Sequence, residues 1–431
     1  MYFNSFNHFL NKKEMPSGPT IENSRDEENS SDGPVAVVAF GNALLDMSIS
    51  VKDDSLINKY GLPCDAQIEV TSEQQGLFSE VIQNYPVEYV AGGSAQNTVR
   101  ILCRLIKNRW PSYVIGKIAH DPVGIILQKL LVQDGVGTRY VFDEKLPTGC
   151  CVAIVRPDGT RCLAANIGAA REFHMENLNS IADMMDLIDR TRILFVEGFF
   201  ASHSPDVAMA ALIRGHSRGG LVRVVSLSAQ YICLQSHSLL RRLLSYANLV
   251  VGNEDEFRAL VDRAGLLVSS ESIDSVARKV AALEYISPVN QLKSCRLSDF
   301  QGSTEAWDWS KLNERLAVVT CGASGAVCAT RSQSWLFPTE KLQSHLVKDT
   351  TGAGDAFLAG FFSEILVGRP MDVCVATGQQ TARIVITQTG CRLPSNFLVV
   401  ISNIYGWRRE IDLLITDFRR RRHTGDGWIP S

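Results

Sequence analysis

The sequence is short of several features that define large classes of protein. Its 431 residues contain no uncharged apolar stretch approaching about 18 residues, the length that a membrane-spanning helix needs. The 11 cysteines stand singly or as the adjacent pair Cys150 and Cys151, with no Cys-x-x-Cys pair and no metal-ligand spacing with histidine. These absences argue against a membrane span, a cysteine-rich metal site and a disulfide framework.

Excess charge is also lacking. The 43 basic and 46 acidic residues give a net charge of −3, which offers no electrostatic case for nucleic acid as a partner. The first ten residues have no uninterrupted apolar core, and no small-residue cleavage site follows, so we expect no secretory signal. We therefore expect a cytoplasmic monomer that binds small molecules and neither a membrane nor nucleic acid.

Strand-like and helix-like patterns alternate from Val35 onward. Residues 35–40 form a β-branched run followed by glycine, typical of a strand in a sheet covered on both faces. Similar runs, separated by helical patterns, recur at 113–115, 151–155, 193–196, 222–227, 249–251 and 316–320. Strands joined through helices imply parallel βαβ crossovers, so we predict a three-layer α/β sandwich with a central, mostly parallel sheet.

Composition divides the chain into segments. Residues 1–33 are polar and are predicted to be a disordered leader in front of a single domain over 34–394. Short strands and turns at about 49–69 and 149–165 predict a small lid on the main sheet. The segment 287–315 has little periodicity and is predicted to be a surface insertion.

The run Asp349-Thr-Thr-Gly-Ala-Gly-Asp355 precedes an apolar stretch with helical character. Its glycines permit a tight turn, and a helix start adds unpaired N–H groups and a positive dipole end, which together favour anions. Such donors stabilise the charge that builds up during phosphoryl transfer. Asp355 is there either a carboxylate that complements the helix dipole or a base that takes a proton from an attacking hydroxyl. No Walker-type P-loop and no protein-kinase signature occurs in the chain.

This run resembles the Asp-Thr-x-Gly-Ala-Gly-Asp signature of the ribokinase-like carbohydrate and nucleoside kinases. The resemblance implies that Asp355 is the catalytic base and that Thr350 lies at the ATP. It also implies an anion hole whose donors come from Gly352, Ala353 and Gly354.

Two further segments carry short polar side chains beside a sheet edge. They are Gly41-Asn-Ala-Leu-Leu-Asp46 and Val87–Asn97, the second with paired glycines in front of a helix. Asp46 and Asn97 are suited to ribose hydroxyls, although capping of turns and helix starts would place the same residues there. Together these segments resemble the adenosine kinases of that family, and the resemblance continues at 147–151, 161–166, 197–200, 252–256 and 388–394.

The resemblance gives roles to residues of a nucleoside site. It implies that Asp46 binds the ribose 2′- and 3′-hydroxyls with the help of Asn42, Gly93, Ser94 and Asn97. It implies that Leu44, Leu163 and Phe200 line a purine slot. The alternative for these three residues is ordinary core packing. Arg161 matches a lid arginine that meets the transferred phosphate, unless it is a solvated surface residue.

The resemblance also implies a nucleotide and metal site. Asn253 and Glu256 match an element that organises Mg²⁺ through water, and the alternative is a helix cap with a surface glutamate. The turn that contains Thr320, Gly322 and Gly325 matches a nucleotide-binding turn, although a plain turn between strands would look the same. The implied reaction is attack by the adenosine 5′-hydroxyl on the γ-phosphate of MgATP, giving AMP and ADP. A kinase for another nucleoside or sugar, or a silent nucleoside-binding homologue, stays open.

The chain departs from the resemblance after Pro394. Residues 395–431 hold an apolar run at 397–401 and four consecutive arginines at 419–422, where the family has a segment that helps to cover the nucleotide. This atypical tail is either a lineage-specific extension or a mis-spliced end, and it bears on ATP affinity. The arginines indicate either nuclear targeting in addition to a cytoplasmic location, or a solvated charge run in a disordered tail.

Overall fold

The computed structural model describes six segments of the chain, 33–63, 67–157, 160–268, 270–286, 308–312 and 314–394. The predicted tail, nearly all of the predicted leader, and residues 287–307 of the predicted insertion lie outside these described residues.

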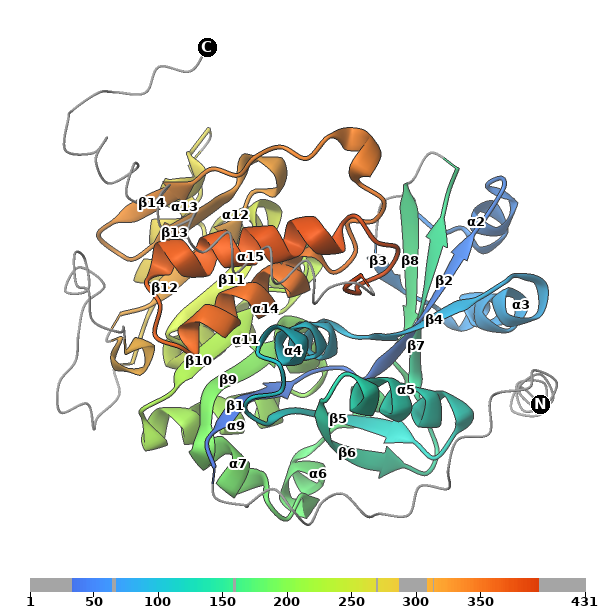
Figure 1. Cartoon of the computed structure of the whole chain (residues 1–431), viewed down its shortest axis with the longest axis horizontal. Helices are drawn as coiled ribbons and strands as arrows, with labels where there is room; N and C mark the ends of the chain where they lie inside the picture. Colours follow the sequence, from blue (N-terminus) through green and yellow to red (C-terminus); the bar gives the residue numbers. More distant parts are fainter. Residues whose placement is uncertain are drawn as a thin grey trace.

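A nine-stranded sheet forms the centre of the molecule (Figure 1). Its strands pair in parallel except for two antiparallel pairings at one edge. In spatial order they are β14 (Ser334–Phe337), β13 (Ala326–Ala329), β12 (Leu316–Thr320), β11 (Leu249–Asn253), β10 (Val222–Ser226), β9 (Thr191–Glu197), β1 (Val35–Phe40), β5 (Ser112–Ala119) and β6 (Gly137–Asp143). The predicted central, mostly parallel sheet is confirmed.

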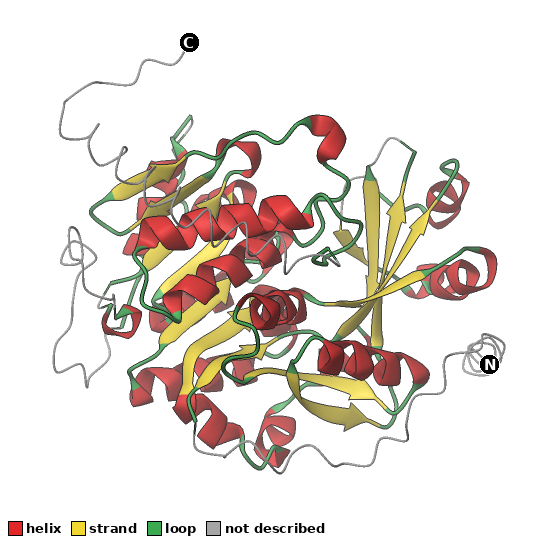
Figure 2. Ribbon diagram, in the orientation of Figure 1, coloured by secondary structure: helices red, strands yellow, loops and turns green. Residues whose placement is uncertain are grey.

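Helices cover both faces of this sheet (Figure 2). In β1, Val37 and Ala39 enter one hydrophobic cluster and Val38 and Phe40 enter the other, as the two-residue period of a strand requires. The first cluster includes residues of α4 (Ser94–Leu105), α5 (Pro122–Gln133), α14 (Ala353–Ile365) and α15 (Met371–Val385). The second includes residues of α7 (Met184–Arg190), α9 (Pro205–Arg218), α11 (His237–Tyr246), α12 (Glu254–Arg263) and α13 (Ile273–Ala282). Within the described segments, none of the helices combines the length and the hydropathy that crossing a bilayer requires.

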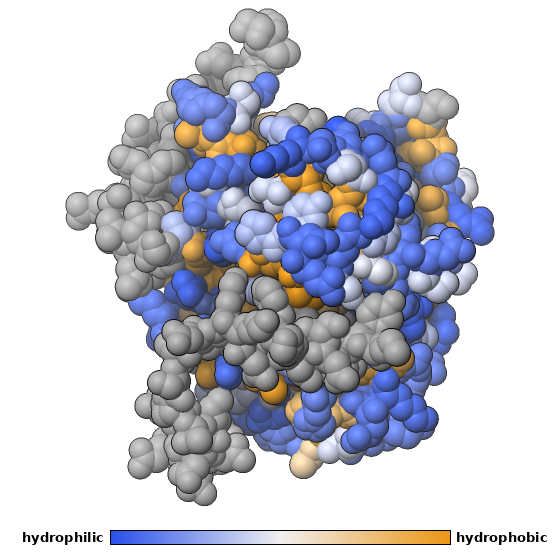
Figure 3. Space-filling view, turned by 90° about the vertical axis from the view of Figure 1, so that its right-hand side faces the viewer, coloured by the Kyte–Doolittle hydropathy of each residue, from blue (hydrophilic) through white to orange (hydrophobic). Residues whose placement is uncertain are grey.

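A second sheet of five strands stands beside the large one (Figure 1). In spatial order its strands are β3 (Gln67–Glu69), β8 (Arg161–Asn166), β7 (Gly149–Val155), β2 (Leu44–Ser50) and β4 (Glu88–Gly92). Met47 and Ile49 pack in a small core with α2 (Ser55–Tyr60) and α3 (Gly76–Asn84), whereas Asp46 and Ser48 face a cavity. Both segments in which a lid was predicted contribute strands to this sheet. On this side of the molecule the surface that is not drawn in grey shows hydrophilic residues around smaller hydrophobic stretches (Figure 3).

The chain passes from the large sheet to the small sheet twice and returns twice. The first passage leaves β1 at Gly41–Ala43, and the first return runs from β4 through Gly93 into α4. Because β1, β9 and β11 are parallel, their carboxyl ends meet at one edge of the large sheet, beside these passages. Ligand sites of open α/β sheets lie at such edges.

The prediction of a surface insertion is wrong at its carboxyl-terminal end. Trp309, Leu312 and Arg315 are 3%, 2% and 1% exposed. The indole of Trp309 packs edge-on against Phe361 and donates a hydrogen bond to the carbonyl of Arg369 at 2.8 Å. The guanidinium of Arg315 donates to backbone carbonyls at the carboxyl-terminal ends of α11 and α13, where a helix leaves carbonyls without intrahelical donors. The irregular sequence here fills the core instead of covering it.

Candidate active site

A cavity of about 590 Å³ lies between the carboxyl edge of the large sheet and the inner face of the small sheet. Its volume suits a small-molecule ligand. It brings together most residues that the sequence predicted for a site, namely Asn42, Leu44, Asp46, Gly93, Ser94, Asn97, Leu163, Asn253, Glu256, Thr350, Gly352, Ala353, Gly354 and Asp355.

The glycine turn before α14 is held by Asp349. This buried carboxylate accepts hydrogen bonds from the N–H groups of Thr351 at 2.6 Å and Gly390 at 2.5 Å. Gly352 caps the helix with a φ of 75°, in the left-handed region that favours glycine. Asp349 was predicted only as the start of the motif, and its role in holding the turn was missed.

The donors of this turn differ in part from the prediction. The N–H of Ala353 donates to the carbonyl of Thr350 at 3.2 Å, so it is used within the turn. The N–H groups of Gly354 and Asp355 belong to the first turn of α14, where a helix offers no intrahelical acceptors. Gly354 is exposed and has open space where a side chain would be. An anion can therefore approach the start of α14 closely.

Asp355 lies between the starts of two helices. Its Oδ1 accepts a hydrogen bond from the Ser94 hydroxyl at 2.6 Å, and its Oδ2 accepts one from the Asn97 amide at 3.1 Å. Ser94 and Asn97 are three residues apart on α4 and so share one face of that helix. Burial raises the pKa of Asp355 to about 6, and these two hydrogen bonds limit the rise. A carboxylate with this pKa is suited to accept a proton near neutral pH.

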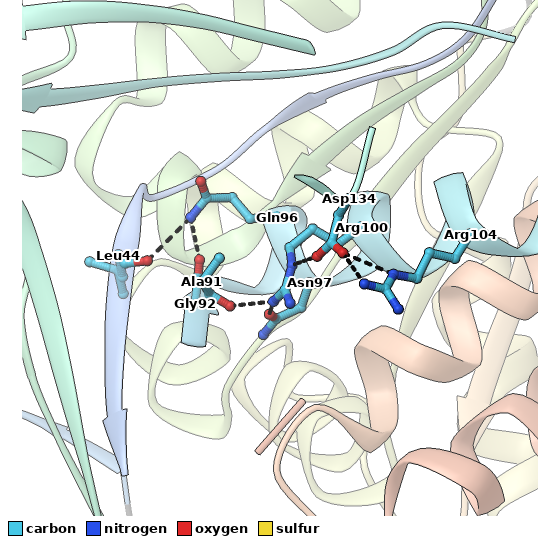
Figure 4. Close-up of polar contacts among 8 residues, drawn as sticks. All are labelled: Leu44, Ala91, Gly92, Gln96, Asn97, Arg100, Arg104 and Asp134. Carbon is cyan, nitrogen blue, oxygen red and sulfur yellow. Dashed lines mark hydrogen bonds and ion pairs between the residues drawn. The ribbon is translucent and has the colours of Figure 1, made fainter. Parts of the chain in front are cut away.

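A chain of contacts behind Asn97 was missed by the sequence reasoning (Figure 4). Arg100 donates to the Asn97 side-chain oxygen at 3.3 Å and to the Ala91 carbonyl at 2.5 Å. Its Nε also donates to Asp134 at 2.7 Å, and Asp134 accepts a second bond from Arg104 at 2.8 Å. These contacts fix the orientation in which the amide of Asn97 donates to the base. The spacing of Asn97 and Arg100 on a helix was the available signal.

Asp46 and Asn42 form the opposite wall of the cavity. A side chain at Gly92 would overlap the carboxylate of Asp46, so glycine there makes room for it. Burial raises the pKa of Asp46 to about 7, with Asp355 adding to the rise and Arg100 opposing it. Asn42 is 2% exposed, and neither polar atom of its side chain has a partner within the described residues. Buried polar atoms that line a cavity without partners indicate a ligand.

The predicted position of Phe200 in the purine slot is wrong. Phe200 is 1% exposed and packs against Phe40 and Phe173, with ring centroids 5.8 and 5.6 Å away. Its neighbour Phe199 lines the cavity instead, 6.3 Å from the ring of Tyr231, which also lines it. Adjacent residues of the short helix α8 (Gly198–His203) point in different directions, and the sequence pattern could not show which phenylalanine faces the ligand.

Four further predicted residues, in addition to Phe200, are not placed in the cavity by the described structure. Arg161 begins β8, but its side chain is outside the described part of the chain, so its role stays a prediction. Thr320 ends β12, and Gly322 and Gly325 lie in the connection to the antiparallel strand β13. These three residues are not among those lining the cavity. Thr320 lies opposite Asn253 in the sheet register, and nucleotide binding at this turn stays a prediction.

Asn253 and Glu256 form a capping box at the start of α12. The Asn253 side chain accepts from the Glu256 N–H at 2.9 Å and donates to Glu256 Oε1 at 2.8 Å. The alternative of a helix cap is confirmed, but Glu256 is only 7% exposed and is not a surface glutamate. Burial raises the pKa of Glu256 to about 7. Within the described residues, no three acidic, histidine or cysteine side chains form a metal-binding group, and the role of these two residues toward Mg²⁺ stays a prediction.

Comparison with known proteins places this architecture in a family. The family model described as "pfkB family carbohydrate kinase" matches residues 56–289 and 299–397. Adenosine kinase 1 of Arabidopsis thaliana is 28% identical over 366 residues, which cover 85% of this chain and 98% of the relative. The adenosine kinase of Schizophyllum commune is 27% identical, covering 81% and 94%.

Solved structures agree with the family match. The Anopheles gambiae adenosine kinase in complex with P1,P4-di(adenosine-5) tetraphosphate has a TM-score of 0.71 and 28% identity, covering 83% of this chain and 98% of that one. The apo structure of the Trypanosoma brucei brucei adenosine kinase has a TM-score of 0.71 and 25% identity, covering 83% and 100%. The predicted ribokinase-like fold is confirmed, and the chain belongs to the pfkB family of carbohydrate kinases.

Proposed function

We propose that this kinase transfers the γ-phosphate of ATP to the 5′-hydroxyl of adenosine and releases AMP and ADP. The observation that carries the proposal is the position of Asp355, which lies at an anion-binding helix start and lines the same cavity as Asp46 and Asn42. The relatives with matching length are adenosine kinases, which supports adenosine as the acceptor.

Asp355 acts as the general base. An acceptor hydroxyl placed near its carboxylate gives up its proton as the oxygen attacks phosphorus. The carboxylate is held by Ser94 and Asn97, so little reorientation is needed when the hydroxyl arrives. The N–H groups of Gly354 and Asp355 stabilise the negative charge on the phosphoryl group in flight.

The opposite wall binds the nucleoside. Asp46 accepts hydrogen bonds from ribose hydroxyls, and the unpartnered amide of Asn42 supplies a further donor and acceptor. Leu44, Leu163 and Phe199 enclose the base by apolar contact and stacking. Closure of the small sheet over the nucleoside excludes water from the reacting groups and suppresses hydrolysis of ATP.

Magnesium completes the site as the counterion of the ATP phosphates. Asn253 and Glu256 line the cavity, and a buried carboxylate of this kind can receive hydrogen bonds from the waters that Mg²⁺ retains. When bound, the ion neutralises phosphate charge as the leaving group departs. The protein residues need only orient its hydration shell.

Turnover on four acceptors tests the proposal. We expect phosphorylation of adenosine to exceed that of ribose, because the cavity pairs a ribose-binding wall with an apolar slot. We expect it also to exceed that of guanosine and inosine, because the relatives of matching length are adenosine kinases. Faster turnover of ribose would favour a sugar kinase of the same fold. If the protein binds adenosine but forms no AMP with MgATP, it is a silent nucleoside-binding homologue. A single chain supplies the whole cavity, so we also propose a monomer, which gel filtration tests.

A further inference from the structure

Glu197 is a fully buried carboxylate at the carboxyl end of β9, and no role was predicted for it. It is 0% exposed as a residue, yet it borders the cavity. Its Oε1 accepts a hydrogen bond from the N–H of Asn42 at 2.8 Å, and its Oε2 accepts one from the N–H of Ala95 at 2.6 Å. One side chain of the large sheet thus bonds two separate backbone segments.

These two segments are passages between the sheets. Asn42 lies where the chain leaves β1 for β2 of the small sheet, and Ala95 lies in the first turn of α4, just after the chain returns from β4. Gln96 of the same helix turn donates to the carbonyls of Leu44 and Gly92, which ties the adjoining ends of β2 and β4 to α4 (Figure 4). Both passages are therefore held at one point of the large sheet.

The fit around this carboxylate is close. A side chain at Gly41 would overlap Ala95 and approach Glu197 Oε2 to 2.8 Å, so only glycine lets the first passage lie against the carboxylate. The start of α4 also favours a negative charge, because the N–H of Ala95 in its first turn donates to Glu197 and the positive end of the helix dipole lies at that turn. Burial raises the pKa of Glu197 to about 8, and the hydrogen bonds from Asn42 and Ala95 oppose the rise.

The bonded segments carry the groups that meet the ligand. Ser94 and Asn97, on either side of Ala95, hold the carboxylate of Asp355. Asn42 lines the same cavity, and its side-chain amide has no partner within the described residues. A shift of either passage would therefore move the nucleoside wall relative to the base.

We infer that Glu197 is a positioning residue that fixes both passages to the large sheet and so aligns the nucleoside-binding wall with Asp355. Its effect on turnover rests on the proposed function, but the clamp itself does not. Glutamine at this position keeps the shape and offers one acceptor oxygen, while its NH₂ group faces a backbone donor, so one of the two bonds is lost.

Amide hydrogen exchange in the full chain tests the clamp directly. In Glu197→Gln we expect the amide of Asn42 or Ala95, or both, to exchange roughly tenfold faster, because one of the two buried hydrogen bonds to this side chain is lost. The control is Val196→Ala, which alters the preceding buried residue of β9 on the opposite face of the sheet. It should leave both amides protected even where it lowers overall stability. Unchanged protection of both amides in Glu197→Gln would overturn the inference.

Two further measurements complete the test. Glu197→Asp, which is too short to reach both amides, should also deprotect at least one of them and replaces the glutamine variant if that variant does not fold. With adenosine and MgATP, Glu197→Gln should lower kcat about tenfold or more, whereas Val196→Ala should leave kcat within about twofold. Faster amide exchange with unchanged kcat would overturn the alignment role. Absence of AMP formation in the wild type would refute the proposed function, while the exchange result would still decide the clamp.

Discussion

Replacing Asp355 by Asn gives the most direct test of the site, because the change removes a charge and a base while keeping the shape of the side chain. The variant retains one oxygen that can accept from Ser94, as Asp355 does at 2.6 Å. Its amide nitrogen would face the amide of Asn97, which donates to Asp355 in the native chain. Asn97 cannot easily turn round, because its oxygen accepts a hydrogen bond from Arg100.

The loss of rate follows from the role of the carboxylate. General bases contribute about 10²- to 10⁴-fold, so we expect kcat for AMP formation to fall by at least about 100-fold. Because burial raises the pKa of Asp355 to about 6, roughly nine-tenths of the wild type holds the ionised base at pH 7. We therefore expect kcat/KM of the wild type to fall as the pH drops through about 6, and the variant to lack this dependence.

Asp355→Asn should raise the stability of the protein although it lowers kcat. A rise in the pKa of Asp355 from 3.8 to about 6 means that the folded state binds the proton more tightly than the unfolded state. The protonated form therefore adds stability below pH 4, and this stability is lost as the pH rises through 6, at a cost of about 3 kcal/mol. Asparagine at position 355 avoids that cost, but its NH₂ group faces the NH₂ group of Asn97, and two donors cannot form a hydrogen bond with each other. We therefore expect a net gain in the free energy of unfolding on the order of 1 kcal/mol at pH 7.5.

Assays of AMP formation and of chemical denaturation on the same variants distinguish a catalytic base from a carboxylate that only complements the helix dipole. The matched control is Asp206→Asn, which removes an exposed carboxylate from the first turn of α9, outside the residues lining the cavity. If Asp355 only complements a helix dipole, both variants should lose a few tenths of a kcal/mol and keep their activity. An Asp355→Asn enzyme with more than about one-tenth of wild-type kcat would refute the assignment of the base.

Other residues of the site give three further predictions. Phe199→Ala should raise KM for adenosine about tenfold, because Phe199 lines the cavity. Phe200→Ala should leave KM unchanged and lower the free energy of unfolding by about 3–5 kcal/mol, because Phe200 packs in the core. Steady-state kinetics and chemical denaturation of both variants test this, and a raised KM in Phe200→Ala with a normal KM in Phe199→Ala would contradict it. Arg100→Met should lower the free energy of unfolding by about 2–4 kcal/mol, because Asp134 is left buried with Arg104 alone. The same variant should lower kcat about tenfold. An unchanged kcat would show that the contact of Arg100 to Asn97 does not orient the base. Glu256→Gln should raise the Mg²⁺ concentration for half-maximal AMP formation about tenfold. The control is Glu254→Gln, a half-buried residue of the same helix turn that does not line the cavity, and an equal effect of this control would argue against a specific role of Glu256.

Local patterns predicted the parts of the molecule that local forces determine. The run at 35–40 was expected as a buried strand and forms β1, because β-branched residues without polar interruptions suit a sheet covered on both faces. The glycine turn at 352–354 was expected at a helix start and precedes and begins α14. In both cases the residues that carry the signal are consecutive in the sequence.

The errors occur where side-chain direction or burial decides. Phe199 and Phe200 share one motif and one short helix, and only packing against Phe40 and Phe173 shows which ring is in the core. Trp309 belongs to a segment without periodicity, so its burial against Phe361 could not be anticipated from spacing. A pattern gives the residue types that a site needs, but it does not give their directions.

The environment of Asp355 shows why the remaining parts of the site were out of reach. Its partners Ser94 and Asn97 lie about 260 positions earlier in the chain, and they meet it only because α4 and α14 begin beside each other at the edge of the sheet. Glu197 is about 100 and 155 positions from the two amides that it holds. Such contacts are created by the crossing of the chain between the sheets and have no local signature. The base and its anion-binding turn are adjacent in sequence, whereas the groups that aim the base come from strand ends and a helix start that the fold brings together.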